Sequence, residues 1–134
     1  MRYLLDTCVI SELISKTPNP HIVAWIDNQD PKELYLSVIT VGEIAKGVAK
    51  LPNSRRKKEI SIWFHDQLSA QFRDRILEID HDTMLLWGNL LGNCEAQGKP
   101  LPLLDSLIAA TVLHHGLVLV TRNERDFRGT GVLF

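Results

Sequence analysis

The sequence contains little cysteine, few aromatic residues and no excess of positive charge. Its two cysteines, Cys8 and Cys94, lie far apart and without CxxC spacing, so the chain offers neither a disulfide framework nor a zinc site. A pair of reduced thiols is typical of a cytoplasmic protein. The net charge of -1 excludes a broad electrostatic attraction to nucleic acid, so any polyanion would have to be held by local basic patches or by bound cations.

The sequence also lacks a long apolar segment and a low-complexity segment. The N-terminal stretch MRYLLDTCVI contains too few apolar residues before Asp6 for a signal sequence or a membrane span. Hydrophobic residues make up 45% of the chain and charged residues 23%, which is ordinary for a globular protein and excludes disorder. We therefore expect residues 1–134 to form one domain with a single core, located in the cytoplasm.

Strand and helix patterns alternate along the chain. Apolar and β-branched segments predict strands at residues 2–5, 33–39, 75–80 and 117–121. Helical spacing and capping residues predict helices at residues 6–15, 21–29, 40–51, 53–72, 81–98 and 104–115, with Pro18 and Pro20 ending the first helix and Gly116 closing the last. This order predicts an α/β fold in which a short parallel sheet is flanked by helices on both faces.

Acidic and amide side chains follow several of the predicted strands. Asp6 directly follows the first strand, Glu43 lies in the first turn of the helix after the second, and the last strand leads to Asn123 and Asp126. Asp105 differs, because it begins a helix that is otherwise apolar. In open α/β sheets ligands bind at the carboxyl ends of the strands, so these side chains are the first candidates for a functional site.

Each acid also has an ordinary structural explanation, which is the more common one for a residue taken singly. Asp6 has the position of a helix N-cap, and Glu43 follows Thr40 at the spacing of a capping box. Asp105 suits the first turn of a helix, where the helix dipole favours a negative charge, and Asp126 suits an exposed surface. For each residue alone the sequence leaves both explanations open.

The position of Asp105 favours a functional role. It shares one face of its helix with Ile108 and Val112, so the carboxylate is expected to point inward. If Asp6 and Glu43 converge there, like charges about 4 Å apart repel by about 4 kcal/mol at an effective dielectric constant of about 20. A hard divalent cation such as Mg²⁺ or Mn²⁺ relieves this repulsion, and acids that hold such cations are typical of phosphoryl chemistry.

Three segments together resemble the motif blocks of the PIN domain family. They are YLLDTCVISEL at residues 3–13, LSVITVGEIAKGV at residues 36–48 and LLDSLIAATVLHHGLVLVTRNERDF at residues 103–127. The resemblance is closest to the VapC and FitB-like branch, the toxins of type II toxin-antitoxin pairs. It implies a Mg²⁺- or Mn²⁺-dependent endoribonuclease that hydrolyses phosphodiester bonds of single-stranded RNA with a metal-activated water, has a short parallel sheet and is inhibited by a cognate antitoxin.

The resemblance also implies roles for individual residues. The three acids that hold the metal in the family match Asp6, Glu43 and Asp105 of this sequence. Polar residues that often support the site match Thr7 and Thr121. These residues form the expected catalytic centre.

The fourth ligand is where the sequence departs from the family pattern. Family members commonly have an acid at the position of either Asn123 or Asp126, and Asn123 is an amide that brings no charge. If NERD, residues 123–126, forms one helical turn, Asp126 lies on the same face as Asn123 and can follow it into the site. We expect Asp126 to act through a water or a second metal, with Asn123 orienting it and Glu124 facing away.

Other features concern partners and alternatives. His114 and His115 suit the last turn of a helix, and RRKK at residues 55–58 suits a solvated face, with a phosphate-contacting rim for RNA as its alternative. Helices rich in leucine, isoleucine and tryptophan predict a homodimer or a larger toxin-antitoxin assembly, in which the antitoxin brings an arginine towards the acids. A non-catalytic RNA-binding or antitoxin-binding module of the same fold stays open as an alternative to the enzyme.

Overall fold

The computed structural model describes residues 1–128 and 130. Within this range the centre of the molecule is a four-stranded sheet in the order β3-β2-β1-β4, formed by β1 (Tyr3–Leu5), β2 (Leu34–Ser37), β3 (Ile76–Leu77) and β4 (Val118–Val120). All neighbouring strands are parallel, and Leu4 lies beside Tyr35 on one side and Leu119 on the other. The predicted α/β fold with a short parallel sheet is confirmed.

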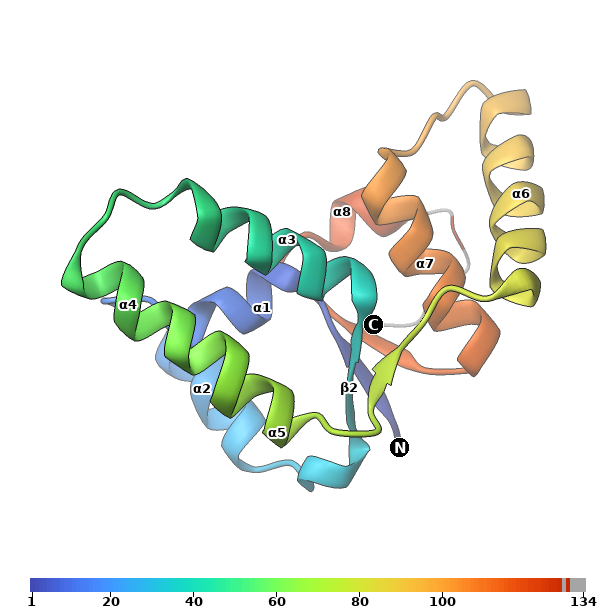
Figure 1. The fold of residues 1–134 in the computed structure, drawn as a ribbon. Helices are drawn as coiled ribbons and strands as arrows, with labels where there is room; N and C mark the ends of the chain where they lie inside the picture. The colour runs from blue at the N-terminus through green and yellow to red at the C-terminus, as the bar shows by residue number, and fades with distance from the viewer. Residues whose placement is uncertain (129, 131–134) are drawn as a thin grey trace.

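Helices connect the strands and cover the sheet on both sides (Figure 1). In the described part of the chain they are α1 (Thr7–Glu12), α2 (Pro20–Asp27), α3 (Val38–Lys50), α4 (Arg55–Ile62), α5 (Ser69–Gln71), α6 (His81–Ala96), α7 (Leu103–His115) and α8 (Glu124–Phe127). A 3₁₀ turn, η1 (Pro31–Glu33), precedes β2, and a π-helical segment, η2 (Trp63–Leu68), joins α4 to α5.

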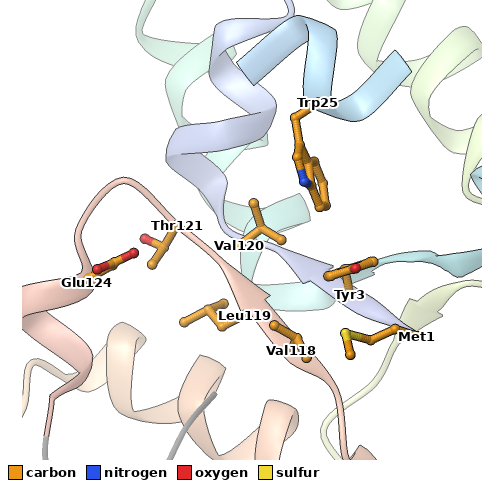
Figure 2. Close-up of a pocket in the computed structure, with 8 residues that line it drawn as sticks. All are labelled: Met1, Tyr3, Trp25, Val118, Leu119, Val120, Thr121 and Glu124. Carbon is orange, nitrogen blue, oxygen red and sulfur yellow. The ribbon is translucent and has the colours of Figure 1, made fainter. Parts of the chain in front are cut away.

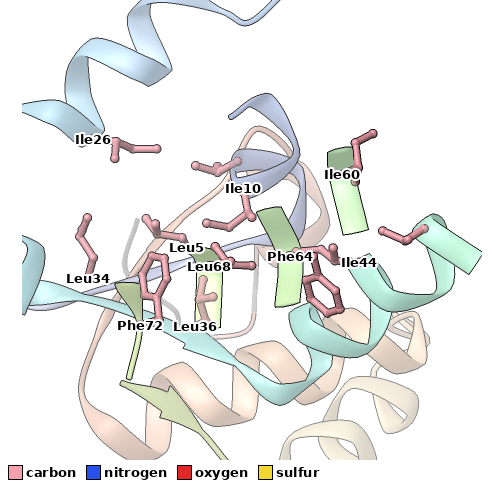
Figure 3. Close-up of a cluster of buried hydrophobic side chains, with 12 residues drawn as sticks. Leu5, Ile10, Ile26, Leu34, Leu36, Ile44, Ile60, Phe64, Leu68 and Phe72 are labelled. Atoms are coloured by element: carbon pink, nitrogen blue, oxygen red, sulfur yellow. The ribbon is translucent and has the colours of Figure 1, made fainter. Parts of the chain in front are cut away.

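Side chains of the strands enter two apolar clusters, one on each face of the sheet. Leu5 and Leu36 belong to the cluster under α1, α2 and α4, which Figure 3 shows. Leu4 and Leu119 belong to the cluster under α7, together with Phe127 of α8. Successive residues of a strand point to opposite faces, so adjacent buried leucines in β1 require helices on both sides. This burial explains why the strands are almost wholly apolar.

The start of α3 differs from the sequence prediction. The Ser37 side chain accepts a hydrogen bond from the Ile39 amide at 3.0 Å, so the strand ends at Ser37 and the helix begins at Val38. The expected capping box of Thr40 and Glu43 is therefore wrong, because both residues lie inside the helix and Thr40 is buried. Inside the helix the same spacing places the two side chains on one face.

Two other helix predictions need correction. α1 ends at Glu12, and Pro20 does not end a helix but begins α2, where a proline is tolerated because its missing amide hydrogen has no partner to lose. The helix expected over residues 53–72 consists of α4, η2 and α5 in succession, and the Ser54 side chain caps its start. These changes move boundaries and leave the order of the elements intact.

Helix α6 forms the outermost layer on its side of the sheet (Figure 1). It packs on α7, where the Trp87 ring N–H donates a hydrogen bond to the buried Ser106 hydroxyl at 2.9 Å. With 16 residues α6 is the longest helix among the described residues. None of the helices in residues 1–128 combines the length and the apolar character needed to cross a membrane.

Candidate active site

The predicted site residues gather at the carboxyl edge of the sheet. Asp6 directly follows β1, and its amide donates to the Val120 carbonyl at 2.9 Å, which continues the β1–β4 ladder by one residue. α3 begins at the end of β2 and carries Glu43, while β4 leads through Thr121 into α8. The edge of a parallel sheet thus brings together residues that are far apart in the sequence.

Asp6 is held by two different groups, one at each carboxylate oxygen. Oδ1 accepts a hydrogen bond from the Thr7 amide at 2.8 Å, which makes Asp6 the N-cap of α1. Oδ2 accepts a bond from the Thr121 hydroxyl at 2.7 Å and lies 3.6 Å from the Cys8 thiol. The side chain is buried, with 6% of its surface exposed. Asp6 therefore caps a helix and also takes part in the carboxylate cluster.

Glu43 is positioned by the same loop that holds Asp6. The Thr7 hydroxyl lies 2.8 Å from Oε1 of Glu43 and 3.0 Å from the Thr40 hydroxyl. Thr7 thus touches Asp6 through its backbone and Glu43 through its side chain. Because α1 and α3 start from neighbouring strands, one threonine orients two acids.

The charges of the other acids act on Asp105. It lies in the first turn of α7, whose N-cap residue Pro102 provides no side-chain cap, and it is partly buried. Burial raises the pKa of its carboxyl group, and the negative charges of Asp6, Asp126 and Glu43 raise that pKa further. The charges of Asp6, Asp126 and Glu43 therefore reach Asp105 across the edge of the sheet.

The turn after β4 has the predicted helical form. Asn123 precedes α8, its amide donates to the Thr121 hydroxyl at 3.0 Å, and its carbonyl accepts from the Asp126 amide at 3.0 Å. Phe127 is buried in the cluster under α7 and anchors this turn. Asp126 is exposed, yet its charge reaches Asp105.

Glu124, the first residue of α8, lies close to Thr121 (Figure 2). It contributes to the lining of a cavity of about 350 Å³ that also contains Tyr3 and Trp25. The Tyr3 and Trp25 rings meet edge to face, with centroids 4.9 Å apart. This cavity extends along β4, and Asp105 is not among the residues that line it.

The donor set fits a hard divalent cation in its chemistry. It consists of carboxylate oxygens, which Mg²⁺ and Mn²⁺ prefer, and no lysine, arginine or histidine in the described part of the chain forms an ion pair with Asp6, Glu43, Asp105 or Asp126. Among the described residues, however, no three histidine, cysteine or acidic side chains are close enough to enclose an ion. The carboxylates thus form an open anionic cluster whose mutual repulsion a cation would relieve.

Sequence reasoning missed two further contacts of this cluster. Cys8 contacts the Asp6 carboxylate, and its sulfur also accepts a bond from the Arg122 amide at 3.4 Å. Thr40, interpreted as a cap, instead contacts Thr7 beside Glu43. The spacing of Thr40 and Glu43 was visible in the sequence, but it signalled a shared helix face rather than a helix start.

The two adjacent histidines lie outside the cluster. His114 and His115 occupy the last turn of α7, as predicted, at the opposite end of that helix from Asp105. Nε2 of His114 is 3.8 Å from the Asp80 carboxylate, and burial lowers the pKa of His115. Neither histidine contacts the four acids.

Comparison with known proteins identifies the family. The PIN domain model matches residues 3–133. Toxin FitB of Neisseria gonorrhoeae is 36% identical over 124 residues, covering 92% of this chain and 89% of FitB, and VapC ribonuclease Y4jK of Sinorhizobium fredii is 34% identical over 129 residues, covering 96% and 92%. In the structure of FitAB bound to an IR36 DNA fragment, one chain matches with a TM-score of 0.93 and 34% identity, covering 98% of this chain and 92% of that chain. The chain belongs to the PIN domain family, in its VapC and FitB-like branch.

Proposed function

We propose that this protein is the toxin of a type II toxin-antitoxin pair and a Mg²⁺- or Mn²⁺-dependent endoribonuclease. One observation carries the proposal: Thr7 bonds to both Asp6 and Glu43 at the carboxyl edge of the sheet, where the charges of these two acids and of Asp126 also act on Asp105. Such a cluster of acids without basic partners suits divalent cations and phosphoryl chemistry. The names of two relatives, a toxin and a ribonuclease, agree with this proposal.

In this proposal Asp6, Glu43, Asp105 and Asp126 hold the cation within the single PIN domain of residues 1–134. The cation, when bound, polarises the scissile phosphate of single-stranded RNA and lowers the pKa of the attacking water. Thr121 fixes one oxygen of Asp6, while Thr7 fixes the other oxygen and orients Glu43. These hydrogen bonds position the acids before the substrate arrives, which reduces the cost of organising the site.

The test is cleavage of a labelled single-stranded RNA by the purified protein, with Mn²⁺ present or chelated. We expect cleavage with Mn²⁺, none with chelator, and none by Asp105→Asn at any Mn²⁺ concentration. The aspartate-to-asparagine change keeps the shape and removes one charge, so a folded variant is expected. RNA binding without cleavage by the wild type would favour the non-catalytic module instead.

The proposal includes an antitoxin that covers an apolar groove next to the acids. The groove has a volume of about 200 Å³ and runs between α1, α3 and α4, with Ile14, Val48 and Trp63 in its wall and with Thr7 and Glu43 at one end. An apolar antitoxin segment in this groove can direct an arginine to the acids, where a cation substitutes for the metal. The FitAB–DNA structure, in which a similar chain occurs, supports an antitoxin partner for this protein.

A homodimer in the cytoplasm is also part of the proposal. Four large apolar side chains are exposed on the outer helices, Met84 and Leu85 of α6 and Leu103 and Leu104 of α7, with exposed fractions of 39% to 60%. Exposed apolar side chains favour association. Light scattering is expected to give twice the monomer mass, and a monomer at high concentration would contradict the dimer.

A further inference from the structure

A polar cavity adjoins the acid cluster at the turn that carries Asp126. It has a volume of about 460 Å³, and its wall includes three arginines, Arg122, Arg125 and Arg128. The cavity begins at Thr121, whose hydroxyl donates to Asp6. The cavity and the acid cluster are therefore neighbours that share Thr121.

Arg122 has a structural partner. Its guanidinium forms an ion pair with Glu12, a side chain with only 11% of its surface exposed. The second carboxylate oxygen of Glu12 accepts a bond from the Asn19 amide at 2.8 Å. Arg122 thus ties the turn after β4 to the end of α1 and to the start of α2. A guanidinium held in this way fixes the turn and is not free to bind a ligand.

Arg125 and Arg128 have no such partner. Both side chains are exposed on the cavity wall, and neither forms an ion pair within residues 1–128. Glu124 also lines the cavity, but no ion pair joins it to either arginine. In the same turn Phe127 is buried, so the backbone between the two arginines is anchored to the core. Their guanidinium groups are therefore available on a fixed piece of chain.

A protein with a net negative charge needs basic side chains to bind a polyanion. The protein has a net charge of -1 and presents four acids at the site, so it repels a polyanion wherever cations are absent. Guanidinium groups bind phosphate oxygens through several donors in a fixed planar geometry. Arg125 and Arg128 flank Asp126, which belongs to the acid cluster, so a phosphate that they hold lies close to the one at the acids.

We propose that Arg125 and Arg128 form a phosphate-binding subsite that holds the RNA backbone next to the scissile phosphate. The proposal rests on the ribonuclease function proposed above and adds the contact that positions the RNA strand. An acidic segment of a protein partner is the competing ligand for two free arginines. The groove lined by apolar residues, on the other side of α1, suits a protein partner better.

The first experiment measures binding of a labelled single-stranded RNA by fluorescence anisotropy, with chelator present and salt varied. The variant Arg125→Gln/Arg128→Gln is compared with Lys32→Gln/Arg73→Gln. The control changes the net charge equally, at two exposed residues near the amino ends of β2 and β3. We expect the slope of log affinity against log salt to fall by about 1.4 for the arginine variant, about 0.7 for each lost phosphate contact, and to stay unchanged for the control.

The second experiment measures cleavage at saturating Mn²⁺, and it separates this inference from the proposed function. We expect the arginine variant to show a KM raised about tenfold with an unchanged kcat, because it loses binding that is equal in the ground and transition states. If RNA binding depends on the two arginines but the wild type never cleaves RNA, the subsite is supported and the proposed enzymatic function is wrong. If the wild type cleaves RNA but the arginine variant behaves like the control in both experiments, the subsite is wrong and the enzyme function stands. The subsite is also wrong if the arginine variant binds RNA normally but no longer binds the antitoxin.

Discussion

The Thr121 hydroxyl donates a hydrogen bond of 2.7 Å to Oδ2 of Asp6, although the two residues lie 115 positions apart in the sequence. The bond joins the end of β4 to the end of β1, the two strands whose ladder Asp6 extends. With the Thr7 amide at Oδ1, both oxygens of this carboxylate have a protein donor. Asp6 is thus oriented by the fold itself.

The Thr121 hydroxyl is expected to support both stability and cleavage. Thr121→Val keeps the shape of the side chain and removes the donor, which should lower the free energy of unfolding by about 1.5–3 kcal/mol, the range for hydrogen bonds to charged groups. Reorientation of Asp6 should also lower kcat about tenfold or more. Urea denaturation and Mn²⁺-dependent RNA cleavage measure the two effects. Thr121→Ser restores the hydroxyl, and a serine variant as impaired as the valine variant would contradict this role.

Asp105 is expected to destabilise the metal-free protein at neutral pH. Its pKa is raised in the folded state, so its carboxyl group favours folding below about pH 4 and this contribution is lost as the pH rises through the folded pKa. Asp105→Asn cannot ionise and should therefore melt at a higher temperature than the wild type at pH 7 without metal. The difference should shrink towards pH 4 and on addition of Mn²⁺ to the wild type. Equal melting temperatures at pH 7 in chelator would show that the acids do not repel one another.

The turn after β4 is expected to contribute its aspartate to metal binding. Asp126→Asn should need much more Mn²⁺ for half-maximal cleavage, because the charge that acts on Asp105 is lost. Glu124→Gln should match the wild type, because Glu124 is not among the acids whose charges raise the pKa of Asp105. Asn123→Ala should stay close to the wild type, because Asn123 supports the turn through backbone bonds that alanine retains. A Mn²⁺ titration that ranks Glu124→Gln as the most impaired variant would contradict this assignment.

The fold class was predictable from the pattern of strands and helices in the sequence. Short strands of two to four residues, such as Tyr3–Leu5, alternate with helices, and this order is compatible with few arrangements other than a covered parallel sheet. The position of Asp6 after a strand and the helical turn of residues 123–126 were also predictable, because both depend on neighbours within a few residues. These two predictions held because each depends only on residues close in the sequence.

Tertiary structure decided what spacing alone left open. Whether Glu43 belonged to an acid cluster depended on the pairing of β1 with β2, which places Thr7 beside it. The contact of Thr7 with Glu43, the bond of Thr121 to Asp6 and the charges that raise the pKa of Asp105 all join distant segments. Such contacts arise only when the strands pair in the order β3-β2-β1-β4, because that pairing brings their carboxyl ends to one edge. The sequence by itself determined which acids were available, and the strand order decided which of them meet.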